Sequence, residues 1–269
     1  MKLPTWWKRC FPALLSAAGM FVLAGCVSAP HTGRTQHMFY NESDDIASGE
    51  EAWQQVRAQE KVSSNAVYTA ALNRVGQNIA AAANKPAYEW EFVVFDSDEA
   101  NAFALPGGKV AVYSSLFQLF DNDAELATVV GHEVAHALAR HGMERSSQST
   151  MQACGGILVE LLLGQDWAPA YQTTSTLLAM LPYSRTQELE ADYLGLILMA
   201  QSGYDPQAAI TFWDKFRKLS QVGVVGEFLS THPDGDNRLE KLKKALPEAQ
   251  AEYRRSKQLG TGQRYTRQK

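Results

Sequence analysis

Residues 132–136 read His-Glu-Val-Ala-His, inside a stretch whose apolar residues recur at helical spacing. On a helix, side chains four residues apart lie on one face, one turn above the other. His132 and His136 therefore face the same way, and two imidazoles at this spacing can bind one zinc ion, while Glu133 projects beside them. The motif predicts one Zn²⁺ per chain, with the two histidines as ligands. It also predicts that Glu133 acts as a general base on a water molecule.

The helix that carries this motif is expected to span residues 123–141. Asn122 can cap its start, and Gly142 provides the stop. The metzincin pattern, in which a third histidine follows on the same chain segment, is excluded because positions 139 and 142 are Ala139 and Gly142. His141 lies one residue before that third position, and we interpret it as a cation near the negative end of the helix dipole.

A third zinc ligand is needed from another segment, and a glutamate on a second helix would make the site a gluzincin. Glu188 and Asp192 are four residues apart at the start of a helix predicted over 185–201, whereas Glu190 points elsewhere. Glu188 could bind zinc, and Asp192 could accept the free N–H of a zinc-bound histidine. Acidic residues at a helix start also offset the helix dipole. Spacing alone therefore leaves the third ligand open.

The overall pattern predicts a mainly helical α+β fold with one domain over residues 45–250. The 269 residues are 45% hydrophobic and 20% charged, which excludes wholesale disorder, and the net charge of -4 argues against nucleic-acid binding through a general basic field. Strand patterns at 88–95, 101–105 and 109–113 predict a small sheet or hairpin beside the zinc helix. The other patterns predict helices, at residues 45–60, 66–83, 115–120, 147–163, 170–181, 206–219 and 236–246.

The N-terminus is predicted to be a bacterial lipoprotein signal. Basic residues precede an uncharged run, residues 10–28, which is interrupted and short for a membrane span. The run closes with Leu-Ala-Gly-Cys at residues 23–26, which resembles a lipobox, where the chain is cut before the cysteine and the cysteine is lipidated. An ordinary cleaved signal or an anchor helix is the alternative. We assign 1–25 as signal peptide, Cys26 as lipidation site and 26–44 as lipidated N-terminus and polar tether.

Two further expectations concern position and the remaining thiol. Val27 follows the cysteine, and by resemblance to enterobacterial sorting the absence of Asp there favours the outer membrane, with the domain on the periplasmic face. Once Cys26 is lipidated, Cys154 is the remaining thiol of the mature chain, and we expect it to be buried as a small apolar residue. Residues 251–269 form a polar, basic tail that is expected to fray.

Several motifs together resemble zinc metallopeptidase family forty-eight, the family of the CAAX prenyl protease. The resemblance covers roughly residues 45–245, and the absence of a long apolar segment after the signal favours the compact lipoprotein type. It is carried by Asn101-Ala-Phe-Ala with Gly107-Gly108, by the run from Gly131 to His141, by Ser184-Arg185 before Glu188-x-x-Ala191-Asp192, and by Thr231-His232-Pro233 with Arg238.

The resemblance implies a gluzincin with zinc on His132, His136 and Glu188. It also implies that Glu133 is the catalytic base and that Asp192 orients a ligand. The expected substrates are unfolded or misassembled envelope proteins, and their extended chains could pair with the hairpin strand at the substrate-binding residues Asn101, Ala102 and Phe103. The second hypothesis is a chaperone-like factor that works with outer-membrane assembly machinery and has latent protease activity.

His232 is expected beside the metal because of the same resemblance. Pro233 disfavours a helical conformation at His232, so the loop sets the position of the imidazole. The imidazole could donate a hydrogen bond to the developing oxyanion. Alternatively, it could occupy the open zinc position and hold the enzyme latent, which is the role we favour.

Overall fold

Two helices that touch at a pair of glycines form the centre of the molecule. The computed structural model describes residues 26–29, 32–176, 180–220, 228, 230, 232 and 237–265. Helix α4 (Asp123–Leu138) crosses helix α7 (Leu181–Gln201) where Gly131 meets Gly195. A Cβ atom on Gly195 would lie 2.8 Å from the backbone nitrogen of His132, and one on Gly131 would lie 2.9 Å from the carbonyl oxygen of Gly195. No side chain fits there, so the two backbones pack directly against each other.

A three-stranded sheet lies beside α4. Its strands are β3 (Glu91–Phe95), β4 (Ala102–Leu105) and β5 (Lys109–Tyr113), in the order β3-β5-β4. Strand β5 runs parallel to β3 and antiparallel to β4, with Ala102 opposite Val112. The two glycines of the β4–β5 turn, at 107 and 108, have φ of 88° and 91°, a region that glycine enters readily. The predicted hairpin is confirmed, and β4 is the edge strand next to the helices.

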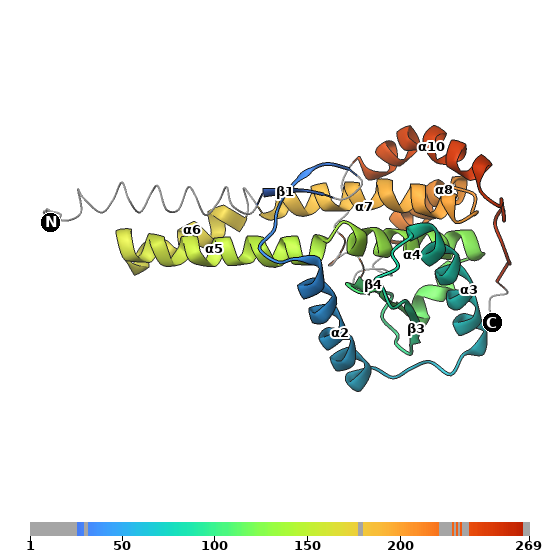
Figure 1. Cartoon of the computed structure of the whole chain (residues 1–269), viewed down its shortest axis with the longest axis horizontal. Helices are drawn as coiled ribbons and strands as arrows, with labels where there is room; N and C mark the ends of the chain where they lie inside the picture. Colours follow the sequence, from blue (N-terminus) through green and yellow to red (C-terminus); the bar gives the residue numbers. More distant parts are fainter. Residues whose placement is uncertain are drawn as a thin grey trace, which may run out of the picture.

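The remaining helices pack around these elements. The mainly helical α+β prediction is confirmed, and the core includes the fully buried rings of Phe120, Phe212 and Tyr204. Figure 1 shows α5 and α6 extending to one side of this body. None of the helices in the described ranges is long and apolar enough to span a membrane. The other elements are β1 (Cys26–Ser28), β2 (Thr35–His37), α2 (Glu42–Gln59), α3 (Ala66–Ala83), η1 (Ser114–Leu119), α5 (His141–Leu163), η2 (Gln165–Trp167), α6 (Ala168–Ser175), α8 (Gln207–Ser220) and α10 (Arg238–Arg255).

The segment predicted to be a polar tether packs against the domain in its described residues. Strands β1 and β2 pair antiparallel, and Gln36 and Met38 are buried. The amide nitrogen of Gln36 donates to the carbonyl oxygen of Ala139 at 2.7 Å, and the backbone N–H of Phe39 donates to Ser147 at 3.1 Å. The side chain of Gln36 and the backbone of Phe39 thus bind polar groups at the end of α4 and on α5, and composition alone does not reveal such partners. The predicted signal peptide, residues 1–25, lies outside the described residues.

The expected fraying of the polar tail is wrong for its described part. Helix α10 continues through Pro247 to Arg255. Beyond it, the hydroxyl of Tyr265 donates to Asp123 at 2.7 Å, and the backbone N–H of Gln263 donates to the same carboxylate at 2.9 Å. Asp123 is the first residue of α4. The tail therefore holds the start of the helix that carries the histidine motif.

The helix boundary after the motif also differs from the prediction. Asn122 caps α4 as predicted, accepting hydrogen bonds from two backbone N–H groups. The helix nevertheless ends at Leu138, because Arg140 adopts a left-handed conformation with φ of 59°. An ion pair between Arg140 and the buried Asp45 stabilises this turn. Gly142 does not terminate α4; it lies inside α5, which begins at His141.

The projecting end of α5 exposes a thiol and apolar side chains. Cys154 is exposed, which corrects the expectation of a buried residue. Ile157, Leu161 and Leu163 on the same helix are each more than 60% exposed. Helix α5 extends to one side of the body, so residues on its projecting part have no core to pack into.

Candidate active site

Four buried side chains meet where α4 and α7 face each other. One donor atom from each of His132, His136, Glu188 and His232 lies within 4.8 Å of the other three. The Nε2 atoms of the two α4 histidines are 3.2 Å apart. The Glu188 carboxylate spans them, with Oε2 3.4 Å from Nε2 of His132 and Oε1 3.4 Å from Nε2 of His136. The helix contact at the two glycines thus brings a carboxylate of α7 to both imidazoles.

The residues fit a metal ion with nitrogen and oxygen ligands. Oε2 of Glu188 and Oε1 of Glu133 are buried and accept no hydrogen bond among the described residues. Their charged neighbours are Arg238, with Nη1 3.4 Å from Oε2 of Glu188, and His232, with Nε2 3.3 Å from Oε1 of Glu133. Buried polar atoms normally have a hydrogen-bond partner, so buried carboxylate oxygens that face imidazole nitrogens without one favour a cation between them. Two histidines and one glutamate are a usual protein ligand set for catalytic zinc. The cluster is therefore a candidate metal centre.

Asp192 lies behind the first histidine. Its Oδ1 is 3.1 Å from Nδ1 of His132, on the opposite side of the ring from the cluster. Arg238 donates two hydrogen bonds to the Asp192 carboxylate, at 2.7 and 2.8 Å. Burial raises the pKa of Asp192, but the charge and hydrogen bonds of Arg238, together with His132, outweigh burial and hold that pKa far below its usual range. The guanidinium group itself lies over the ring of Trp213, 4.9 Å from the centroid.

The charges of the site favour a cation at its centre. Burial lowers the pKa of His132, but Asp192 and Glu188 outweigh it and raise that pKa to about 9. Burial likewise raises the pKa of Glu188, and His132 outweighs it, so the carboxyl has a lowered pKa. By contrast, burial and the neighbouring histidines lower the pKa of His136. Glu188 and Asp192 therefore both carry negative charge beside the imidazoles, and Arg238 balances one of the two charges.

His141 has a different position from the one expected. It is buried at the start of α5, and its Nδ1 lies 2.8 Å from Nδ1 of His136. Its Nε2 lies 3.0 Å from Oε2 of Glu190. The interpretation as a cation at the end of α4 is wrong, because that helix ends three residues earlier and the chain turns back toward the site. Glu190 does not join the metal cluster, and it points away from it.

His232 lies over the cluster on the side of Glu133. Its Nε2 is 3.3 Å from Oε1 of Glu133, and its ring stacks on Phe228 with centroids 4.4 Å apart. The ring centroids of His132 and His136 are 5.3 and 5.4 Å away. The neighbouring Pro233 lies outside the described residues.

The predicted substrate-binding residues lie on the edge of the sheet. Ala102 and Phe103 belong to β4, and the carbonyl oxygen of Asn101 accepts a hydrogen bond from Tyr113 at 2.9 Å. Strand β4 pairs with β5 on one side and contacts α4. Sequence reasoning missed the contacts of Trp213, whose ring lies 5.6 Å from that of His132. No sequence signal distinguishes this tryptophan from an ordinary core residue.

Comparisons with known proteins identify the family. Residues 67–246 match the model for Peptidase family M48. The chain is 42% identical over 178 residues to the mitochondrial metalloendopeptidase OMA1 of Arabidopsis thaliana, covering 65% of this chain and 36% of the relative. It is 31% identical over 247 residues to the OMA1 metalloendopeptidase of Schizosaccharomyces pombe, covering 89% and 72%. It is 30% identical over 220 residues to the beta-barrel assembly-enhancing protease of Escherichia coli, covering 78% and 45%.

The match covers the functional site and most of the described body. The chain spans less than half the length of the Arabidopsis and Escherichia coli relatives. The matched region, 67–246, includes both α4 histidines, Glu188 and His232, and it accounts for more than half of the 269 residues. The resemblance to metallopeptidase family forty-eight is confirmed: this chain belongs to peptidase family M48, with the buried histidine and glutamate cluster of a metalloendopeptidase.

Proposed function

We propose that this protein is a zinc endopeptidase that hydrolyses peptide bonds of unfolded or misassembled envelope proteins. The observation that carries the proposal is the buried cluster of His132, His136 and Glu188, with Glu133 beside it. These three ligands would hold one zinc ion per chain. When bound, zinc supplies a Lewis acid that polarises the scissile carbonyl and lowers the pKa of a water molecule.

The protein's own groups then handle the proton. Glu133 takes a proton from the attacking water at a carboxylate oxygen and passes it to the leaving amine nitrogen. Its Oε1 is buried, accepts no hydrogen bond of good geometry among the described residues, and lies 3.3 Å from Nε2 of His232. Asp192 positions the ring of His132 through Nδ1, and Arg238 keeps Asp192 ionised.

Substrate binding is assigned to the edge of the sheet. An extended peptide can add a strand beside β4 at residues Asn101, Ala102 and Phe103, through backbone hydrogen bonds that depend little on sequence. Folded proteins rarely offer a free extended segment, so this mode favours unfolded chains.

The first experiment combines metal analysis with casein cleavage. The purified full chain is expected to contain one zinc ion per molecule and to cleave casein, an unfolded substrate. A tightly folded protein of similar size serves as the control substrate and should remain intact. A chain that contains no zinc and cleaves no casein after zinc addition would overturn the proposal.

His232 is assigned to latency, since its imidazole lies within the metal-ligand group. As a fourth ligand it would close the position that water needs. We expect His232→Ala to keep one zinc per chain and to cleave casein faster. If His232 occupies the fourth ligand position in about nine molecules in ten, removing its imidazole raises the rate about tenfold. The initial rate of casein cleavage, normalised to zinc content, measures this effect.

The alternative role of His232 has the opposite result. An imidazole that donates to the developing oxyanion contributes about 10²–10³ to the rate. A loss of that size in His232→Ala with unchanged zinc would replace latency with oxyanion stabilisation. His37→Ala is the matched control, because that histidine is only partly buried in β2 and takes no part in the cluster.

The anchor is assigned to Cys26 on the basis of the Leu-Ala-Gly-Cys sequence at 23–26. Lipid chains on this residue would hold the protein at the outer membrane with the domain in the periplasm. Cys26→Ala is expected to move the protein from the membrane pellet to the soluble fraction. Cys154→Ala should stay in the pellet. Membrane association of Cys26→Ala in high salt would instead indicate a retained N-terminal helix or the exposed apolar residues Ile157–Leu163.

A second candidate function is favoured by one relative. The Escherichia coli protein at 30% identity is named a beta-barrel assembly-enhancing protease. A chaperone-like assembly factor with latent protease activity would act by binding other proteins at its surface. It would not need to hydrolyse peptide bonds. In a strain that lacks the protein, full rescue by Glu133→Gln would favour the assembly role, whereas no rescue would favour proteolysis.

A further inference from the structure

Two carboxylates two residues apart on α7 each support one histidine of α4. Asp192 reaches the first directly, with Oδ1 3.1 Å from Nδ1 of His132. Glu190 reaches the second through another imidazole. Its Oε2 lies 3.0 Å from Nε2 of His141, whose Nδ1 lies 2.8 Å from Nδ1 of His136. Both carboxylates therefore contact a histidine of α4. Asp192 does so directly, and Glu190 does so through the imidazole of His141.

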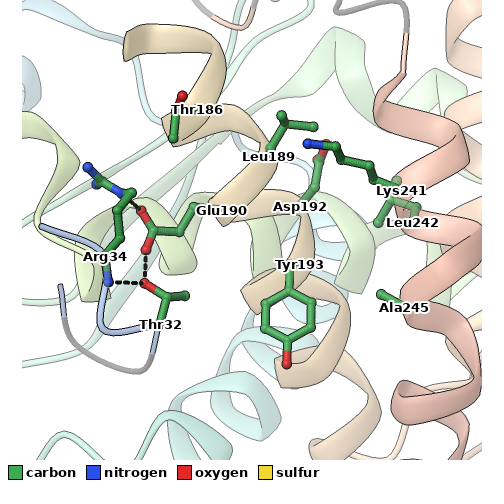
Figure 2. A pocket seen from close by; sticks show the side chains of 10 residues that line it. All are labelled: Thr32, Arg34, Thr186, Leu189, Glu190, Asp192, Tyr193, Lys241, Leu242 and Ala245. Carbon is green, nitrogen blue, oxygen red and sulfur yellow. Dashed lines mark hydrogen bonds and ion pairs between the residues drawn. The ribbon is translucent and has the colours of Figure 1, made fainter.

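Each carboxylate in turn binds an arginine. Arg238 of α10 holds Asp192, and Arg34 of the N-terminal segment holds Glu190. Nε of Arg34 donates to Oε2 of Glu190 at 2.6 Å, and Thr32 donates to the other oxygen of the same carboxylate. Figure 2 shows both residues meeting Glu190 at the edge of a cavity between this segment, α7 and α10.

Arg34 also bridges to a second helix. Its two terminal nitrogens donate to the carboxylate of Glu144 on α5, at 3.0 and 2.7 Å. The side chains of Glu144 and Glu190 are 0% and 5% exposed, and that of Arg34 is 18% exposed. Removing one partner of such a buried pair leaves an uncompensated charge. Arg34 therefore compensates the charges of both buried carboxylates, Glu144 and Glu190.

The chain of contacts has a direction. A histidine that binds a metal through Nε2 carries its proton on Nδ1 and needs an acceptor there. For His136 that acceptor is Nδ1 of His141, so the proton of His141 must lie on Nε2 and point to Glu190. Because Oε2 of Glu190 lies 3.0 Å from Nε2 of His141, a correctly placed Glu190 selects this tautomer. Arg34 fixes the position of Glu190.

We propose that Arg34 is a positioning residue for the metal centre, acting through Glu190 and His141 on His136. The inference rests on the proposed metal site. It makes Thr32 and Arg34 part of the support of the metal centre, although the sequence suggests only a tether there. The segment is anchored on the domain by Gln36 as well, which donates to Ala139 at the end of α4.

The test measures zinc affinity rather than catalysis. In the full chain, Arg34→Met is expected to weaken zinc binding by about 10–100-fold, the range for partners that orient metal-bound histidines. Arg34→Lys keeps the positive charge but cannot contact Glu144 and Glu190 at the same time as arginine does. Its zinc affinity should therefore lie between those of Arg34→Met and the native chain. Competition with a chelator gives the zinc dissociation constants. Thr32→Val removes one hydrogen bond to Glu190 and is a smaller change. It tests the same contacts from Glu190 through His141 to His136 if Arg34→Met does not fold.

Arg74→Met is the matched control. Arg74 makes a two-bond ion pair with the buried Asp123 at the other end of α4, at 2.7 and 3.0 Å. This variant should lower the melting temperature but leave zinc affinity unchanged. Side-chain ¹H–¹⁵N spectra of the histidines add a readout that general destabilisation does not alter. We expect His141 to be protonated at Nε2 in the native chain and in Arg74→Met, and to populate both tautomers in Arg34→Met.

The outcomes separate this inference from the proposed function. Native zinc affinity and a single His141 tautomer in Arg34→Met and Thr32→Val would overturn the role of Arg34 and leave the zinc peptidase intact. Equal losses of zinc affinity in Arg34→Met and Arg74→Met would also overturn it, because they would show a stability effect. Absence of zinc binding in the native chain would overturn the proposed function itself.

Discussion

Glu133→Gln is expected to lower casein cleavage by at least about 10²–10⁴-fold, the range for loss of a positioned proton-transfer group. Glutamine keeps the shape of the side chain but cannot accept the proton of water. Glu133 is not one of the four residues whose donor atoms surround the candidate metal position. Zinc content and melting temperature should therefore stay close to those of the native chain. Single-turnover cleavage of a labelled peptide, with zinc measured on the same sample, checks both statements.

The control for this substitution lies on the same helix. Glu125 is also a buried glutamate of α4, and its carboxylate pairs with Lys215 at 2.6 Å, two turns before the motif. Glu125→Gln should cost stability but retain cleavage. If Glu133→Gln kept a tenth or more of the native rate, the assignment of the general base would be wrong.

Glu188→Ala is expected to abolish both zinc retention and cleavage. Glu188 is the carboxylate that spans the Nε2 atoms of both α4 histidines, so its removal takes away one of the three proposed metal ligands. A ligand that binds only the folded chain stabilises it, so the native protein is expected to gain about 2.7 kcal/mol of stability at a zinc concentration 100 times its dissociation constant, and Glu188→Ala should gain none. Zinc per chain after dialysis and thermal unfolding with and without zinc are the measurements.

Glu190 provides the comparison within the same Glu-Leu-Glu sequence. Glu190→Ala removes the partner of His141 and is expected to weaken zinc binding by about 10–100-fold without abolishing it. Glu188→Gln keeps the volume of the side chain and shows whether a loss in Glu188→Ala reflects misfolding. Full zinc occupancy in Glu188→Ala together with loss in Glu190→Ala would reverse the ligand assignment.

The sequence predicted those helices and strands whose ends are marked by nearby capping or turn residues. Helix α3 spans Ala66–Ala83 as predicted, since Asn65 caps its start and the chain reverses at Asn84 before a proline. The hairpin follows from Pro-Gly-Gly at 106–108. The spacing also predicted that His132 and His136 share one face of α4 and that Glu188 and Asp192 share one face of α7, because a helix fixes the direction of residues four apart. That these two faces meet was implied by the family resemblance.

Features that depend on distant partners could not be predicted. Arg140 ends α4 in a left-handed conformation that arginine seldom adopts, and the ion pair with Asp45, 95 residues away, stabilises it. His141 therefore seemed to belong to the end of α4. Arg34 finds its carboxylates 110 and 156 residues further along the chain. A polar segment has the same composition whether it is solvated or bound, so its role appears only in the folded structure.

The contact between Asp123 and Tyr265 has a consequence for the order in which the molecule matures. The first turn of α4 receives its last partners from a segment made 142 residues later, through the hydroxyl of Tyr265 and the backbone N–H of Gln263. Until residue 265 has left the ribosome, the carboxylate at the start of the histidine helix lacks two of its hydrogen bonds. A nascent chain that lacks residues 263–265 therefore holds this helix less firmly than one that includes them. Synthesis supplies these two partners only after every motif residue from His132 to His232 has been made.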